Sequence, residues 1–167
     1  YKSFMEWGMD GEANAFLEEV LLWLSENLPL NPNPKKLCWG DSRLGNVLFE
    51  NFQVKSLLDW EMATIGDPLC DLAWGLTTDD VSSHGLNIEK LPGSIANEEA
   101  IKFWEKNTGF SADNFYYYRI LCLFKFSVIM IRVAKKLIHS EIMPLDSDFH
   151  INNHVSNYLK QEFNEKN

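Results

Sequence analysis

Apolar side chains recur at helical spacing through residues 11–28, and the positions between them are rich in glutamate. This pattern predicts an amphipathic helix, which the prolines at positions 29, 32 and 34 end. A longer apolar pattern predicts a buried helix from about 112 to 140, with basic residues near its C-terminal end. Shorter helices are predicted over 69–76, between Asn97 and Gly109, and after Pro144.

β-Prone residues are confined to a short part of the chain. Val47–Phe49 and Val54–Leu58 are joined by the four residues 50–53, which predicts a β-hairpin. Leu37–Trp39 is predicted to be a short extended segment before it. Because the partners of an antiparallel pair run in opposite directions, the hairpin should return Asp59 to the neighbourhood of Asn46.

The stretch 79–96 is polar and contains a Pro-Gly pair, so it predicts an irregular connection. We expect the Asp79-Asp80 pair at its start to face solvent. The expected fold is therefore mainly α with a small β-hairpin (an α+β class), and the length favours a single domain over residues 1–167.

The composition and charge of the chain disfavour some classes of binding partner. The formal charge of −9 argues against nucleic acid or an anionic membrane, since both reward clusters of Lys and Arg. Cys38, Cys70 and Cys122 are widely spaced, which favours small core residues in a reducing cytoplasm. The longest apolar stretch, 120–133, is interrupted by charges and is too short to span a bilayer.

Asp41, Asn46 and Asp59 are the candidate chemical residues. Phosphoryl transfer needs a carboxylate to orient the acceptor hydroxyl and oxygen ligands for magnesium. Asp41 suits the first task, and Asn46 and Asp59 suit the second; the spacing of five from Asp to Asn is that of protein kinases. Gly45 is predicted to provide the sharp turn before Asn46. The alternative is that these residues cap turns.

Two runs of sequence carry a family resemblance: WGDSRLGNVLF at 39–49 and LDWEMATIGDPLCDLAW at 58–74. They resemble the aminoglycoside phosphotransferase (choline kinase-like) family, and within it the branch also found fused to acyl-CoA dehydrogenases. The clear match covers residues 37–76, which would hold the catalytic loop and the metal hairpin. The resemblance implies the C-terminal, substrate- and metal-binding lobe of a protein kinase-like fold.

The resemblance also implies roles for individual residues. Asp41 would be the catalytic base, and Asn46 and Asp59 would bind magnesium and, through it, ATP. Glu61 would assist the metal through water, and Arg43 would contact phosphate or substrate. The implied reaction is transfer of the γ-phosphate of ATP to a hydroxyl of a small molecule. In the family pattern, Asp67 and Asp71 are structural and tie the turn and the following helix to the catalytic loop.

The chain departs from the family in two respects. Trp39 stands where the family usually has His. No glycine-rich phosphate loop occurs, and only Lys2 precedes Lys35, so we expect the N-terminal nucleotide-binding lobe to be absent and this chain alone to be inactive. The start at Tyr1 suggests that an N-terminal portion is missing. The alternative is a non-catalytic, pseudokinase-like or truncated binding module. The acceptor and the oligomeric state stay open.

Overall fold

The computed structural model describes residues 2–165, which form two compact units. One unit comprises residues 2–28 and 120–165, and the other spans Pro29–Arg119. The long helix α5 (Phe115–His139) begins in the second of these and continues in the first. The sequence-based prediction of one domain over 1–167 stays a prediction.

The helical unit contains α1 (Lys2–Met9), α2 (Ala15–Glu26), most of α5 and α6 (His154–Asn164). Its fully or nearly fully buried apolar side chains include Leu17, Val20, Leu24, Val128, Ile131, Val155, Leu159 and Phe163. Lys135 Nζ donates to the Met9 carbonyl oxygen at 2.7 Å and lies 3.1 Å from Glu12 Oε1. This unit is therefore held by an apolar helix interface, to which Lys135 on α5 adds polar contacts with the end of α1 and the loop after it.

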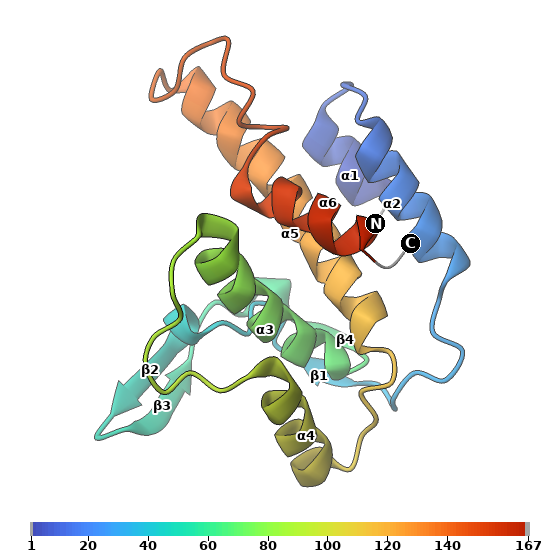
Figure 1. The fold of residues 1–167 in the computed structure, drawn as a ribbon, viewed down its shortest axis with the longest axis vertical. Coiled ribbons are helices and arrows are strands. Elements are labelled where there is room, and N and C mark those ends of the chain that lie inside the picture. Colours follow the sequence, from blue (N-terminus) through green and yellow to red (C-terminus); the bar gives the residue numbers. More distant parts are fainter. Residues whose placement is uncertain (1, 166–167) are drawn as a thin grey trace. The chain divides into compact units, whose positions relative to one another are not determined.

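The second unit begins with short strands, and the helices α3 and α4 follow them (Figure 1). Its elements are β1 (Lys36–Cys38), η1 (Leu44–Asn46), β2 (Val47–Glu50), β3 (Gln53–Leu57), η2 (Trp60–Met62), β4 (Thr64–Gly66), α3 (Leu69–Ser83), η3 (His84–Leu86) and α4 (Asn97–Thr108). β1 pairs with β4 and β2 pairs with β3, both antiparallel. The segment after β1 leads through η1 into the hairpin, and the segment after β3 leads through η2 to β4 and then to α3.

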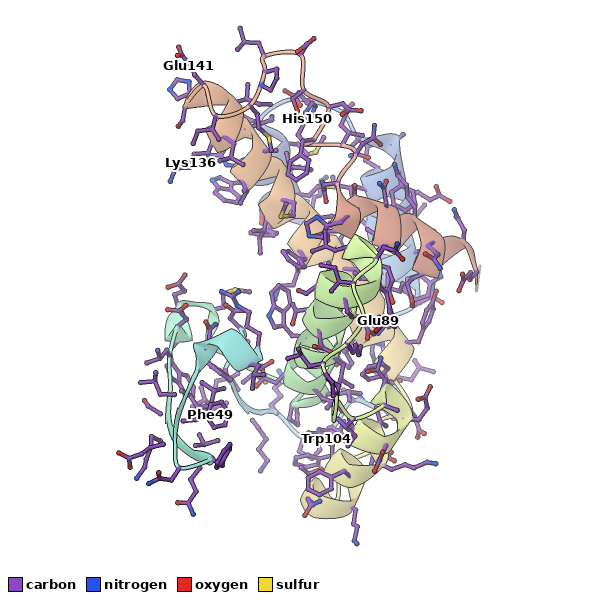
Figure 2. The ribbon with its side chains drawn as sticks, turned by 60° about the vertical axis from the view of Figure 1, so that its left-hand side comes forward. Phe49, Glu89, Trp104, Lys136, Glu141 and His150 are labelled. Carbon is purple, nitrogen blue, oxygen red and sulfur yellow. The ribbon has the colours of Figure 1, made fainter. Side chains whose placement is uncertain are left out.

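The β2–β3 hairpin is exposed on both faces. All five residues of β3 are exposed, as are Leu48, Phe49 and Glu50 of β2. Its turn is formed by Asn51 and Phe52, both with positive φ (50° and 61°), as in the tight turns that match strand twist. Figure 2 labels Phe49 on this hairpin, whose side chains project outward from the ribbon. A two-stranded hairpin of this kind is marginally stable without further packing.

The mainly helical class with one small hairpin is confirmed, and the long helix lies where the periodicity predicts it. Gly109 ends α4 in a left-handed conformation (φ 71°), as expected. Three predicted details were wrong. The helix α3 continues to Ser83, so residues 79–83 are helical, and Gly45 lacks the positive φ of a sharp glycine turn. Asp79 is exposed as predicted, but Asp80 is buried. Within residues 2–165, no helix combines the length and apolar character that crossing a membrane requires.

Candidate active site

The predicted catalytic loop (residues 39–46) is anchored by Asp71 on the first turn of α3. Its Oδ2 accepts the Trp39 backbone N–H at 2.7 Å, and its Oδ1 accepts that of Gly40 at 2.8 Å. Ser42 Oγ donates to the Asp71 carbonyl oxygen at 2.6 Å. The loop therefore leaves β1 with its backbone fixed to the helix, as the structural role predicted for Asp71 requires.

Asp67 has a similar structural role at the turn before α3. Its carboxylate accepts the Leu69 backbone N–H and the backbone and side-chain N–H groups of Asn33 at 2.9–3.0 Å. Tyr118 donates its hydroxyl to Asp67 Oδ2 at 3.1 Å, and burial together with the Asp67 charge raises the pKa of that phenol. The role of Asp67 as a structural tie is thus confirmed.

Gly40 brings the catalytic loop against the segment that follows Asp59. Its φ is 91°, and a Cβ atom there would overlap the Met62 carbonyl oxygen. Both conditions require glycine, because L-residues rarely adopt this φ and no side chain fits the contact. The glycine that the loop needs is therefore Gly40 and not Gly45.

Three donors hold the Asp41 carboxylate. The Trp74 indole N–H on α3 donates to Oδ1 at 2.7 Å, and Asn46 Nδ2 donates to Oδ2 at 2.7 Å. Arg43 Nε also reaches Oδ2, at 3.1 Å. The side chain of Asp41 is 15% exposed, so the carboxylate is oriented yet still accessible. Sequence reasoning did not identify Trp74, because nothing in the pattern of α3 distinguishes an indole that faces the loop from one in the core.

Asn46 and the peptide before Asp59 are joined directly. Val47 pairs with Leu57 in the hairpin, and the Leu58 N–H donates to the Asn46 carbonyl oxygen at 2.8 Å. Because Asn46 uses its Nδ2 on Asp41, its Oδ1 is left without a protein donor within residues 2–165. The hairpin thus brings the chain back to Asn46 as predicted.

Asp59 has an exposed side chain and an uncommon backbone. It adopts a left-handed conformation (φ 55°, ψ 62°) just before η2. Its carboxylate forms no hydrogen bond or ion pair with any other residue of the described part of the chain. This leaves both of its oxygens available to a ligand from outside the protein.

The other two predicted site residues lie at the same loops. Glu61 lies on η2 and is exposed, and Arg43 is paired with Asp41 with its own side chain 53% exposed. Among residues 2–165, no three His, Cys, Asp or Glu side chains gather where they could hold a metal ion. The predicted magnesium ligands differ from such a cluster in that one of them, Asn46, would contribute an amide oxygen.

A hollow of about 580 Å³ lies beside the catalytic loop. Loop residues 42–45 form one wall, α3 forms another, and Ser94 and Ile95 come from the segment before α4. Ser82 and Ser94 add hydroxyl groups to this lining, and Leu76 and Ile95 add apolar surface. The hollow therefore offers mixed polar and apolar contacts to a small molecule.

Trp39, the departure from the family pattern, has defined partners. Its indole N–H donates to the Leu58 carbonyl oxygen at 2.6 Å. Its ring packs against that of Trp60, with centroids 6.1 Å apart and planes inclined by 37°. The indole therefore connects the start of the catalytic loop to the residues on both sides of Asp59.

Two acyl-CoA dehydrogenase family members are similar to this chain in sequence. Acyl-CoA dehydrogenase family member 11 of Pongo abelii is 33% identical over 124 residues, which is 68% of this chain and 16% of that protein. Acyl-CoA dehydrogenase family member 10 of Mus musculus is 30% identical over 131 residues, or 72% of this chain and 12% of that protein. The chain thus spans less than a fifth of the length of these relatives, which agree with the branch that the motifs indicated.

A solved structure from Ralstonia eutropha JMP134, provisionally assigned as an aminoglycoside phosphotransferase, shares the fold with a TM-score of 0.69. The similarity covers 97% of this chain and 52% of that one, at 17% sequence identity. The Phosphotransferase enzyme family matches residues 3–100, a range that contains the catalytic loop, the hairpin and α3. This chain therefore belongs to the phosphotransferase enzyme family.

Proposed function

We propose that this chain is the catalytic-loop lobe of an ATP-dependent kinase that transfers the γ-phosphate to a hydroxyl group of a small molecule. The observation that carries the proposal is the Asp41 carboxylate, which is oriented by Trp74, Asn46 and Arg43 while remaining accessible. A carboxylate fixed in this way is suited to accept the proton of an acceptor hydroxyl as the oxygen attacks phosphorus.

The residues present fit a magnesium ion. Magnesium prefers oxygen ligands, and the Asn46 Oδ1 and the Asp59 carboxylate lack protein partners within residues 2–165. We propose that these two side chains hold the ion, with Glu61 assisting through water and Arg43 contacting phosphate. When bound, magnesium neutralises charge on the phosphates. The chain's own task is to orient the hydroxyl and take its proton at Asp41.

We also propose that a nucleotide-binding lobe outside this chain completes the site, and that the 167-residue chain alone is inactive. The exposed hairpin supports this, because Phe49, Phe52 and Val54 are 51%, 104% and 59% exposed on a sheet too small to be stable alone. The hollow beside residues 42–45 is our proposed place for the acceptor. Because the cysteines are present as thiols, we propose a cytoplasmic location.

The test uses the complete gene product with ATP, magnesium and a panel of hydroxylated acceptors. Phosphorus NMR would detect the new phosphate ester. Asp41→Asn should lower kcat about 10²- to 10⁴-fold, while calorimetry should show unchanged binding of magnesium and ATP. Asp113→Asn, an exposed aspartate outside the site, is the matched control and should leave kcat unchanged. Near-native turnover of Asp41→Asn would refute the role of base; ATP binding without transfer to any acceptor would favour the non-catalytic module.

A further inference from the structure

The conformation of Asp59 requires support from its neighbours. Its backbone is left-handed, which is uncommon for a residue with a side chain, and its carboxylate has no partner within residues 2–165. A magnesium ligand must nevertheless be presented in a fixed direction, because magnesium demands near-ideal octahedral geometry. The support must therefore act on the backbone around Asp59.

Trp39 holds the peptide unit that enters Asp59. The Leu58 carbonyl oxygen, which accepts the Trp39 indole N–H at 2.6 Å, belongs to the peptide bond between Leu58 and Asp59. Since a peptide unit is planar, fixing its oxygen also fixes the direction of the Asp59 nitrogen. Leu58 is held from its other side as well, because its N–H donates to the Asn46 carbonyl oxygen.

The residue after Asp59 is held by the same indole. The Trp60 ring packs against the Trp39 ring, and the Trp60 indole N–H donates to the Leu57 carbonyl oxygen at 2.8 Å. Asp59 is thus flanked by two residues that Trp39 contacts, one by a hydrogen bond and one by ring packing.

Trp39 is itself fixed to α3, because its backbone N–H donates to Asp71. The same helix carries Trp74, whose indole orients Asp41. One helix therefore positions both predicted site carboxylates, Asp41 through Trp74 and Asp59 through Asp71 and Trp39.

We infer that Trp39 is a positioning residue that sets the direction of the Asp59 carboxylate through its indole N–H. The consequence for metal binding rests on the proposed function, in which Asp59 is a magnesium ligand. A purely space-filling role for the indole would need only its ring. Trp39→Phe separates the two, because it keeps an aromatic ring and removes the donor. Trp39→His offers a ring N–H again.

The experiment uses the 167-residue chain labelled with ¹⁵N and Mn²⁺ as the probe metal. Trp39→Phe should shift the amide resonances of residues 58–60 and weaken Mn²⁺ binding about three- to tenfold, the usual range for one hydrogen bond. The Mn²⁺ dissociation constant of Trp39→His should lie within about twofold of that of the native chain. Trp104→Phe is the matched control on α4 and should change neither readout (Figure 2).

The outcomes separate this inference from the proposed function. Unchanged 58–60 resonances and an unchanged Mn²⁺ dissociation constant in Trp39→Phe would overturn the inference. If the native chain binds no Mn²⁺ but Trp39→Phe still shifts residues 58–60, the positioning role stands and the metal role of Asp59 fails. Should Trp39→Phe not fold, hydrogen exchange in the native chain decides: a Trp39 indole N–H exchanging as fast as that of Trp104 contradicts the hydrogen bond.

Discussion

Asp80 and Asp59 are aspartates of the same unit in opposite surroundings. Asp80 on α3 is 2% exposed, and its carboxylate accepts Lys90 Nζ, Arg119 Nη1 and Asn97 Nδ2, each at 2.7 Å. Asp59 is exposed and has no protein partner within residues 2–165. A carboxylate whose donors all come from its own chain contributes to stability, whereas one without donors is available for a ligand. Substitutions should therefore separate stability from function.

The largest effect is expected for Asp80→Ala, which should lower the free energy of unfolding by about 3–5 kcal/mol. The reason is that Arg119 and Lys90 would both lose the buried carboxylate that their charges contact. Urea titration, monitored by circular dichroism, measures this free energy of unfolding.

Asp79→Ala is the matched control, because the neighbouring carboxylate contacts the same Lys90 at 2.7 Å but is 56% exposed. An exposed ion pair is worth at most about 1 kcal/mol. Equal losses for the two substitutions would contradict the contrast between a buried and an exposed partner of Lys90.

Asp59→Asn should weaken ligand binding and leave the stability almost unchanged, which is the reverse of what we expect for Asp80→Ala. We expect the affinity for magnesium and ATP in the complete gene product to fall about 100-fold, or about 2.7 kcal/mol, because a charged ligand is replaced by a neutral one. The free energy of unfolding should change by less than about 0.5 kcal/mol, since Asn tolerates the left-handed backbone and no protein contact is lost. Calorimetry and urea titration measure the two quantities. A loss of stability without a loss of affinity would show that Asp59 supports the fold and does not bind the ligand.

Gly40→Ala tests whether the region around Asp59 is as rigid as the contacts indicate. The added Cβ would overlap the Met62 carbonyl oxygen at a φ of 91°, so we expect a loss of about 2 kcal/mol in unfolding free energy. Gly45→Ala has open space and an ordinary φ, so it should be neutral within about 0.5 kcal/mol. Differential scanning calorimetry compares the pair. A neutral Gly40→Ala would mean that the loop and the Met62 segment separate easily.

These residues also show what a sequence can reveal. The hairpin, the long helix and the spacing of Asp41, Asn46 and Asp59 follow from local periodicity and motif, and the chain returns to Asn46 as expected. Asp80 was wrongly predicted to face solvent, because its cations come from positions 90 and 119, outside any local window. β4 was missed for the same reason, since its partner β1 lies far earlier in the chain.

The roles of the two indoles at the site, Trp39 and Trp74, could not be predicted from the sequence either. Trp39 was recognised as a departure from the family, but its hydrogen bond to Leu58 depends on how the loop after β1 meets the end of β3. Local pattern therefore identifies the residues that carry the proposed chemistry, whereas the residues that orient them require the fold.

The smallest effect is expected from acid, and it concerns the buried carboxylate of Asp80. Burial alone would raise the pKa of Asp80, but the hydrogen bonds from Lys90 and Arg119, the Arg119 charge and the Asn97 bond outweigh it and lower this pKa. A lowered folded-state pKa stabilises the fold above the unfolded pKa of about 3.9, and that contribution is lost as the pH falls through the folded value. The difference in unfolding free energy between the native chain and Asp80→Asn should therefore be constant from neutral pH to about pH 5 and shrink below about pH 4. Urea titrations of the native chain and of Asp80→Asn at several pH values measure this difference. A difference for Asp80→Asn that stays constant into strong acid would show that its partners do not favour the ionised carboxylate.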